Sequence, residues 1–118
     1  MLGVILFAHG SRDPLWRQPI EAVAERIRAS APQVPVRCAY LELTTPDLPT
    51  AATDLIAAGA TLVRVTPLFL GTGKHAREDL PLLMAQLRSA HPAVQFELQS
   101  PVGEDPRVTA LMAEIALG

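Results

Sequence analysis

The stretch MLGVILFAHGSRDP, residues 1–14, decides the fold of this 118-residue chain. Its apolar run does not alternate with polar residues, which is typical of a parallel strand covered on both faces, and we predict a strand over 3–8. The run is too short to span a membrane and lacks the basic flank of a signal peptide. Asp13 followed by Pro14 indicates a helix start, because aspartate caps free amides and proline suits the first helical position.

The same unit of a strand followed by a helix recurs along the chain. Further strands are predicted over 34–40, 61–66 and 94–98. The pairs Thr45-Pro46 and Asp105-Pro106 repeat the signal of a cap followed by proline, and Gly59 is expected to end the second helix. Each predicted helix carries an apolar face that we assign to the core. These faces are Ile20, Val23, Ala24 and Ile27; Ala51, Ala52, Leu55 and Ile56; Leu80, Leu83, Met84 and Leu87; and Val108, Leu111, Met112 and Ile115.

The alternation of strands and helices with short connections predicts an α/β fold. We expect one three-layer domain over 1–118, with a four-stranded parallel sheet of order 2-1-3-4, helices on both faces and right-handed crossovers. In such sheets ligands bind beyond the carboxyl ends of the strands, where the strand order reverses. That position lies between the first and third strands. The loops that follow these strands are AHGSRD, residues 8–13, and PLFLGTGKHARED, residues 67–79.

Composition narrows the class of protein. With 49% hydrophobic and 19% charged residues the chain is globular. A net charge of −2 provides no basic field, which argues against a nucleic-acid partner. The single cysteine, Cys38, cannot form an internal disulfide, and its apolar surroundings predict buried packing. A reducing cytoplasm agrees with this use of cysteine.

Each of the two loops at the sheet edge carries one histidine, His9 or His75, and we expect His75 just before a helix start. Imidazole is the commonest side-chain ligand of divalent transition metals. Two ligands are too few for a closed structural zinc site, which needs four. The pair therefore predicts an open, weakly held metal position that suits metal transfer. The third histidine, His91, lies where a helix ends, and we assign it to helix termination and solvent.

Three residues near this pair have two interpretations each. Glu42, at the end of the second strand, is either a third ligand or proton acceptor, or a surface loop residue. Gly71 and Gly73 either allow the loop to turn or allow a bulky flat ligand to approach the backbone.

Two phosphate-binding motifs, the P-loop and the histidine phosphatase motif, are excluded because required residues are missing. A P-loop requires a glycine five positions before Gly73, where Leu68 stands, and Ser or Thr directly after Lys74, where a histidine stands. Histidine phosphatases require arginine directly before the nucleophilic histidine, and Ala8 stands there. A phosphatase or phosphate-binding domain is therefore disfavoured.

Basic side chains surround the two histidines. Arg12, Lys74 and Arg77 cluster at helix starts, where the helix dipole disfavours cations, and this clustering indicates an anionic ligand. The alternative is that they are solvated helix starts, and we make that assignment for Arg17.

The segments AHGSRD, AYLELTTPDL (39–48) and TPLFLGTGKHAREDLP (66–81) resemble the small chelatases of the CbiX type over nearly the whole chain. The resemblance implies insertion of Co²⁺ or Fe²⁺, with Ni²⁺ as a further candidate, into sirohydrochlorin or a related tetrapyrrole of cobalamin or sirohaem biosynthesis. It implies that His9 and His75 bind the metal and that Glu42 lines the site. It also implies a homodimer, since the short members of the family pair.

The chemistry of the residues agrees with this resemblance. Such tetrapyrroles carry many carboxylates, which basic side chains would pair with. The predicted substrate-binding set is Ser11, Arg12, Gly71, Gly73, Lys74 and Arg77. Insertion releases two pyrrole protons, and His9, His75 or Glu42 would accept them as the catalytic set. No cofactor beyond the metal substrate, no nucleic acid and no membrane is expected. A macrocycle needs two walls, which favours a second copy. The alternative function is a non-catalytic carrier of metal or tetrapyrrole.

Overall fold

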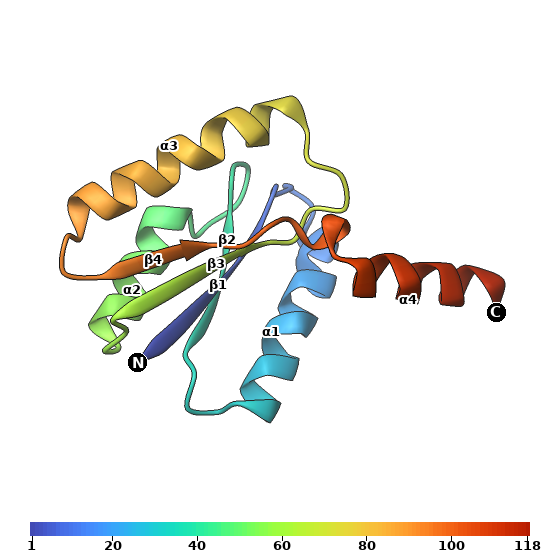
Figure 1. Ribbon diagram of the computed structural model, residues 1–118, viewed down its shortest axis with the longest axis horizontal. Coiled ribbons are helices and arrows are strands. Elements are labelled where there is room, and N and C mark those ends of the chain that lie inside the picture. The colour runs from blue at the N-terminus through green and yellow to red at the C-terminus, as the bar shows by residue number, and fades with distance from the viewer.

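The computed structural model describes all residues 1–118 and contains one parallel sheet with the order β2-β1-β3-β4 (Figure 1). The strands are Leu2–Ala8 (β1), Val36–Tyr40 (β2), Leu62–Pro67 (β3) and Gln95–Leu98 (β4). The helices are Gln18–Ser30 (α1), Leu48–Ala57 (α2), Lys74–Ala90 (α3) and Pro106–Leu117 (α4), with 3-10 turns at Pro14–Arg17 and Val102–Glu104. The predicted α/β class and strand order are confirmed, and every strand boundary lies within two residues of its prediction.

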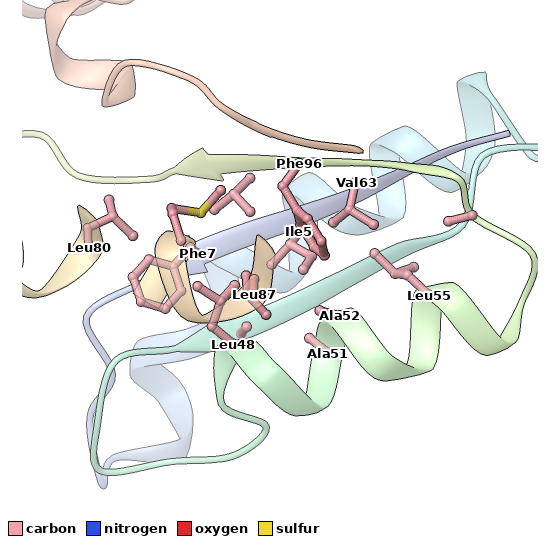
Figure 2. Packing of buried hydrophobic residues seen from close by; sticks show 14 of the residues in the cluster. Ile5, Phe7, Leu48, Ala51, Ala52, Leu55, Val63, Leu80, Leu87 and Phe96 are labelled. Atoms are coloured by element: carbon pink, nitrogen blue, oxygen red, sulfur yellow. The ribbon is translucent and has the colours of Figure 1, made fainter. Parts of the chain in front are cut away.

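The main core lies between the sheet and the helices α2 and α3 (Figure 2). Ile5 and Phe7 of β1 point to this side, and the parallel register places Val63 and Val65 of β3 beside them. On the opposite side α1 covers a smaller cluster of Val4, Leu6, Ala24 and Val36. Because β1 is covered on both faces, its residues 4–8 are all buried, and this explains the apolar run that does not alternate.

Most of the predicted helix faces are correct. Ala24, Ala51, Ala52, Leu55, Leu80, Met84 and Leu87 are buried, and Ile20, Ile27, Ile56 and Leu83 are half-buried. The prediction is wrong for Val23, which is exposed on α1. Cys38, predicted to be buried, is half-buried and free, with its Sγ 3.9 Å from the carbonyl oxygen of Ile20. Burial raises the pKa of the Cys38 thiol.

Aspartates begin the helical segments. Asp13 accepts a hydrogen bond from the Leu15 amide at 2.9 Å and opens a 3-10 turn that leads into α1. The predicted start of α2 at Thr45-Pro46 is wrong, because the Pro46 carbonyl accepts the Tyr40 amide at 2.9 Å and so extends the edge of β2. The cap of α2 is Asp47, which accepts the Thr50 amide at 2.9 Å, and proline follows at position 49. Asp105 caps α4 as predicted.

Helix α4 forms as predicted but does not pack inward. It extends away from the sheet (Figure 1), and none of its residues is buried. The prediction that Val108, Leu111, Met112 and Ile115 enter the core is therefore wrong. The reason lies in the sheet, because the face of β3 and β4 on the α1 side is polar. It carries an Arg64–Glu97 ion pair at 3.3 Å and a hydrogen bond of 2.6 Å from the Thr66 hydroxyl to Gln99.

None of the helices has the length and apolar character required to cross a lipid bilayer.

Candidate metal and substrate site

The loop after β1 holds His9 against the segment that follows β2. The amide of Glu42 donates to the His9 carbonyl at 3.0 Å, which extends the β1–β2 pairing past the strand ends. Gly10 makes this contact possible, because its φ is +106° and an added Cβ would lie 1.8 Å from the Glu42 carbonyl oxygen. A glycine is therefore required here, both for its backbone conformation and for the close approach of the two loops.

The side chains of His9 and Glu42 meet at the carboxyl end of β1. The Nε2 atom of His9 lies 2.8 Å from Oε1 of Glu42, and both side chains are about half exposed. In the neutral imidazole with its proton on Nε2, that N–H donates to the carboxylate and leaves the Nδ1 lone pair free. A carboxylate that holds one ring nitrogen of a histidine orients the other toward a metal. Glu42 is thus an exposed loop residue whose carboxylate contacts His9.

His75 lies in the first turn of α3 and not before the helix. Gly73 caps α3, and the Arg77 amide donates to the Gly73 carbonyl at 3.0 Å. One turn further on, Oδ2 of Asp79 lies 2.9 Å from Nε2 of His75. Sequence reasoning missed Asp79 because the helix was expected to begin after the histidine. The available signal was the i, i+4 spacing, which brings two side chains together only on a helix.

The two histidines therefore make the same kind of contact, His9 in the loop after β1 and His75 in the first turn of α3. Each imidazole uses Nε2 to contact a carboxylate, Glu42 for His9 and Asp79 for His75, and each keeps Nδ1 for another ligand. No three His, Cys, Asp or Glu side chains gather closely enough to hold a metal ion. One chain thus supplies two separate imidazole–carboxylate pairs rather than a closed metal cage.

The basic residues predicted for an anionic ligand lie on the surface around these pairs. Arg12, Lys74 and Arg77 are all exposed, and Lys74 has only a weak ion pair, with its Nζ 4.0 Å from Glu78. These cations are therefore accessible to a ligand. Arg17, which we assigned to a solvated helix start, stands directly before α1, donates to the Thr44 hydroxyl at 3.1 Å and lies 3.4 Å from a carboxylate of α1.

The small residues predicted to bind substrate, Ser11, Gly71 and Gly73, have different surroundings in the two loops. Ser11 shapes the first loop, because its Oγ accepts the Asp13 amide at 3.1 Å. Gly71 and Gly73 have no left-handed φ, and a Cβ added at either position would meet nothing within 4 Å. The free chain therefore does not require glycine at 71 or 73 in order to turn. The backbone at both positions is open on the side where a side chain would stand.

A cavity that sequence reasoning did not identify opens beside Asp79, between α2 and α3. Its volume is about 350 Å³. The lining is mostly apolar and consists of Phe7, Tyr40, Leu41, Asp47, Leu48, Pro49, Asp79, Leu82, Leu83 and Gln86. Burial, reinforced by the nearby Cys38 and Glu21, raises the pKa of Tyr40 to about 12. An uncharged phenol and an apolar wall thus adjoin the second imidazole–carboxylate pair.

Comparison with known proteins places this chain in a family. A model of the CbiX family matches residues 3–116. The chain is 31% identical to the sirohydrochlorin cobaltochelatase of Saccharolobus solfataricus, over 97% of this chain and 92% of that protein.

Solved structures of similar proteins agree with this family assignment. A CbiX protein of Marinobacter aquaeolei has a TM-score of 0.82 and 32% identity, covering 98% of this chain and 94% of its own. The sirohydrochlorin chelatase SirB of Bacillus subtilis subspecies spizizenii, in complex with cobalt, has a TM-score of 0.81 and 28% identity. The match covers 96% of this chain and spans 48% of that longer one. The family model, the sequence relatives and the solved structures agree, and this chain belongs to the CbiX family.

Proposed function

We propose that this chain inserts a divalent metal, Co²⁺ or Fe²⁺, into sirohydrochlorin or a closely related tetrapyrrole. The observation that carries the proposal is the pair of imidazole–carboxylate contacts, His9 with Glu42 after β1 and His75 with Asp79 in the first turns of α3. Membership of the CbiX family and the similarity to a sirohydrochlorin cobaltochelatase support the substrate.

His9 and His75 receive the metal through their Nδ1 atoms. Both imidazoles must be neutral to bind, and the carboxylates of Glu42 and Asp79 keep the ring proton on Nε2. Because only two protein ligands engage the ion, its remaining positions stay open to water and to the pyrrole nitrogens. An open position of this kind suits an ion that must leave the protein for the macrocycle.

Insertion replaces two pyrrole protons by one divalent ion, so the charge of the macrocycle is unchanged and two protons must be accepted. As each nitrogen binds the metal, its N–H bond breaks and the proton passes to a base. Two acceptors stand at the site, one in each imidazole–carboxylate pair. Once the metal has left, each imidazole can take a proton on Nδ1, and its carboxylate stabilises the resulting charge. No oxidant or reductant enters this step.

Basic side chains and an uncovered stretch of backbone bind the macrocycle. Arg12, Lys74 and Arg77 are exposed cations that pair with its peripheral carboxylates. Gly71 and Gly73 leave the backbone of the second loop uncovered, so a flat ring can approach it closely. The Ser11 hydroxyl retains its proton for donation to the substrate.

Two further properties belong to this proposal. The chain acts as a homodimer, because one four-stranded domain supplies a single wall and a macrocycle is bound between two. The reaction takes place in the cytoplasm, where a reducing environment keeps Cys38 as the free thiol that the structure contains.

The test is a direct assay. Purified protein is mixed without oxygen with sirohydrochlorin and Co²⁺ or Fe²⁺, and the change in absorbance is compared with the rate in the absence of protein. We expect acceleration with at least one of the two metals. Tight binding of metal and tetrapyrrole without acceleration would overturn the chelatase and favour a carrier.

A further inference from the structure

Leu43 is the only residue other than glycine that has a left-handed backbone, with a φ of +67°. The other positions with positive φ are all glycine, namely Gly10, Gly59 and Gly118. The Thr44 amide donates to the Glu42 carbonyl at 2.9 Å and closes a three-residue turn with Leu43 at its centre. Turns of this hand are rare and strained, because a side chain at the centre crowds the neighbouring carbonyl. The leucine therefore carries a strain that glycine at this position would not.

The side chain of Leu43 does not compensate the fold for this strain. It is 48% exposed, and it belongs to neither of the two buried apolar clusters. An exposed leucine alone is common on protein surfaces and needs no explanation. An exposed leucine that also keeps a strained backbone is not explained by folding, and strain of this kind is concentrated at functional sites.

The turn is fixed beside the first imidazole–carboxylate pair. Glu42, directly before Leu43, has its carboxylate 2.8 Å from Nε2 of His9, and its amide donates to the His9 carbonyl at 3.0 Å. On the other side of the turn, Arg17 donates to the Thr44 hydroxyl at 3.1 Å. These contacts hold the turn at both ends, so the Leu43 side chain is already in place next to the proposed metal position. A ligand that binds there does not have to order this turn first.

The ligand of the proposed function has two kinds of surface. A tetrapyrrole carries charged substituents around its rim and has a flat, apolar face. The exposed cations Arg12, Lys74 and Arg77 are assigned to the rim carboxylates, and none of them provides an apolar contact for the face. A macrocycle whose nitrogens reach a metal at His9 must cover the surface beside Glu42. Leu43 is the exposed apolar side chain that directly follows Glu42 in the chain.

We infer that the Leu43 side chain packs against the flat face of the tetrapyrrole and so sets the position of the ring relative to the metal. The inference rests on the proposed function and adds an apolar contact to its charged ones. It has a distinctive consequence, because the same side chain strains the fold and strengthens substrate binding. Replacing it should therefore move stability and substrate affinity independently.

The deciding variant is Leu43→Asn. Asparagine is close to leucine in size and tolerates a left-handed backbone, so the thermal midpoint should stay the same or rise. The Kd for metal-free sirohydrochlorin should increase about 5- to 30-fold, because an apolar contact is lost and an amide is covered instead. Binding is followed through the fluorescence of Trp16, the only tryptophan of the chain, which stands in the 3-10 turn after the His9 loop.

Two further variants serve as controls. Leu43→Met keeps an apolar side chain of similar volume and should bind sirohydrochlorin within about 3-fold of the unmodified chain. Val23→Asn removes an exposed apolar side chain from α1 and should leave the Kd for sirohydrochlorin unchanged. The affinity for Co²⁺ in the absence of tetrapyrrole should be the same in all three variants, because none of them changes a proposed metal ligand.

Three outcomes would overturn the inference. The first is an unchanged affinity for sirohydrochlorin in Leu43→Asn, and the second is an equal loss of affinity in Val23→Asn. The third is a clear fall of the thermal midpoint in Leu43→Asn, which would show that the leucine serves folding.

The insertion assay is run on the same variants, so the two proposals fail separately. Weaker binding of sirohydrochlorin by Leu43→Asn, with no acceleration of insertion by any form of the chain, would overturn the proposed function alone. Unchanged binding by Leu43→Asn, with insertion still accelerated, would overturn the inference alone. Failure of the unmodified chain to bind sirohydrochlorin would overturn both.

Discussion

His75 and Asp79 stand one helical turn apart on α3, with imidazole Nε2 2.9 Å from carboxylate Oδ2. The variant Asp79→Asn keeps an oxygen at this position but removes the negative charge that fixes the ring proton. We expect Co²⁺ affinity to fall about 10- to 100-fold, as for other carboxylates that support a metal-binding histidine. Titration followed through the visible spectrum of Co²⁺ measures the affinity. Glu78→Gln, with the same loss of charge one residue away, is the control, and an equal loss in both variants would contradict the role of Asp79.

His9→Ala and His75→Ala should each abolish metal insertion, because each removes one of the two proposed metal ligands. Both side chains are at least 47% exposed, so the thermal midpoint should change little. The control is His91→Ala, since His91 caps the end of α3 through its backbone amide. The insertion rate and the unfolding midpoint are measured together. Full activity in either site variant would exclude that histidine as a ligand.

Arg12→Ala should raise KM for the tetrapyrrole while it leaves Co²⁺ affinity unchanged, because the exposed guanidinium is assigned to substrate carboxylates. We expect an increase of about 5- to 30-fold, the effect of one charge-assisted contact. Arg26→Ala removes an equally exposed arginine from the middle of α1 and serves as the control. Equal losses of metal and substrate affinity in Arg12→Ala would contradict the assignment.

Gly10→Ala should destabilise the chain by at least about 2 kcal/mol, because the position combines a left-handed backbone with a clash at the Glu42 carbonyl. Gly71→Ala is the contrasting variant, since a Cβ there meets nothing within 4 Å. It should leave the free energy of unfolding unchanged and raise KM for the tetrapyrrole. Denaturant unfolding and steady-state kinetics separate the two effects. A stability loss in Gly71→Ala would restore the interpretation of that glycine as a turn residue.

Tyr40 is the only tyrosine of this chain, so its titration can be followed without interference from another phenol. Burial raises the pKa of Tyr40 from 10.0 to about 12. Between pH 10 and 12 the folded chain keeps the phenol proton and the unfolded chain releases it, so stability should fall as the pH rises through this range. Phenolate absorbance measures the folded titration, with the denatured chain as the reference near the ordinary pKa. Coincident curves would contradict the burial of Tyr40.

Much of the fold follows from local signals in the sequence. The apolar run of β1 reflects burial on both faces, and Asp13 and Asp105 with the prolines after them mark real helical starts. Thr45-Pro46 carries the same signal and misleads, because the Pro46 carbonyl bonds to β2, a contact that lies outside the local sequence. The strand order places the loop of His9 directly after β1, whereas His75 lies in the first turn of α3, beyond the end of β3 at Pro67.

Other features depend on contacts that the sequence does not reveal. Asp79 was missed because its relation to His75 requires the helix to begin at Lys74, and boundaries are the least certain part of a sequence prediction. The apolar face of α4 was assigned to the core because helical spacing predicts a buried face but does not identify the surface that buries it. The structure shows that the neighbouring face of the sheet carries the Arg64–Glu97 ion pair and that α4 stays exposed.

The junction at Gly103 has a thermodynamic consequence. Since the 102–104 turn and the loop before His75 share a backbone hydrogen bond and a contact that admits no side chain, movement of one displaces the other. Opening of the 102–104 turn and occupancy of the proposed metal position are then coupled equilibria, and such coupling is reciprocal. By whatever factor opening of the turn weakens Co²⁺ binding, bound Co²⁺ disfavours opening of the turn.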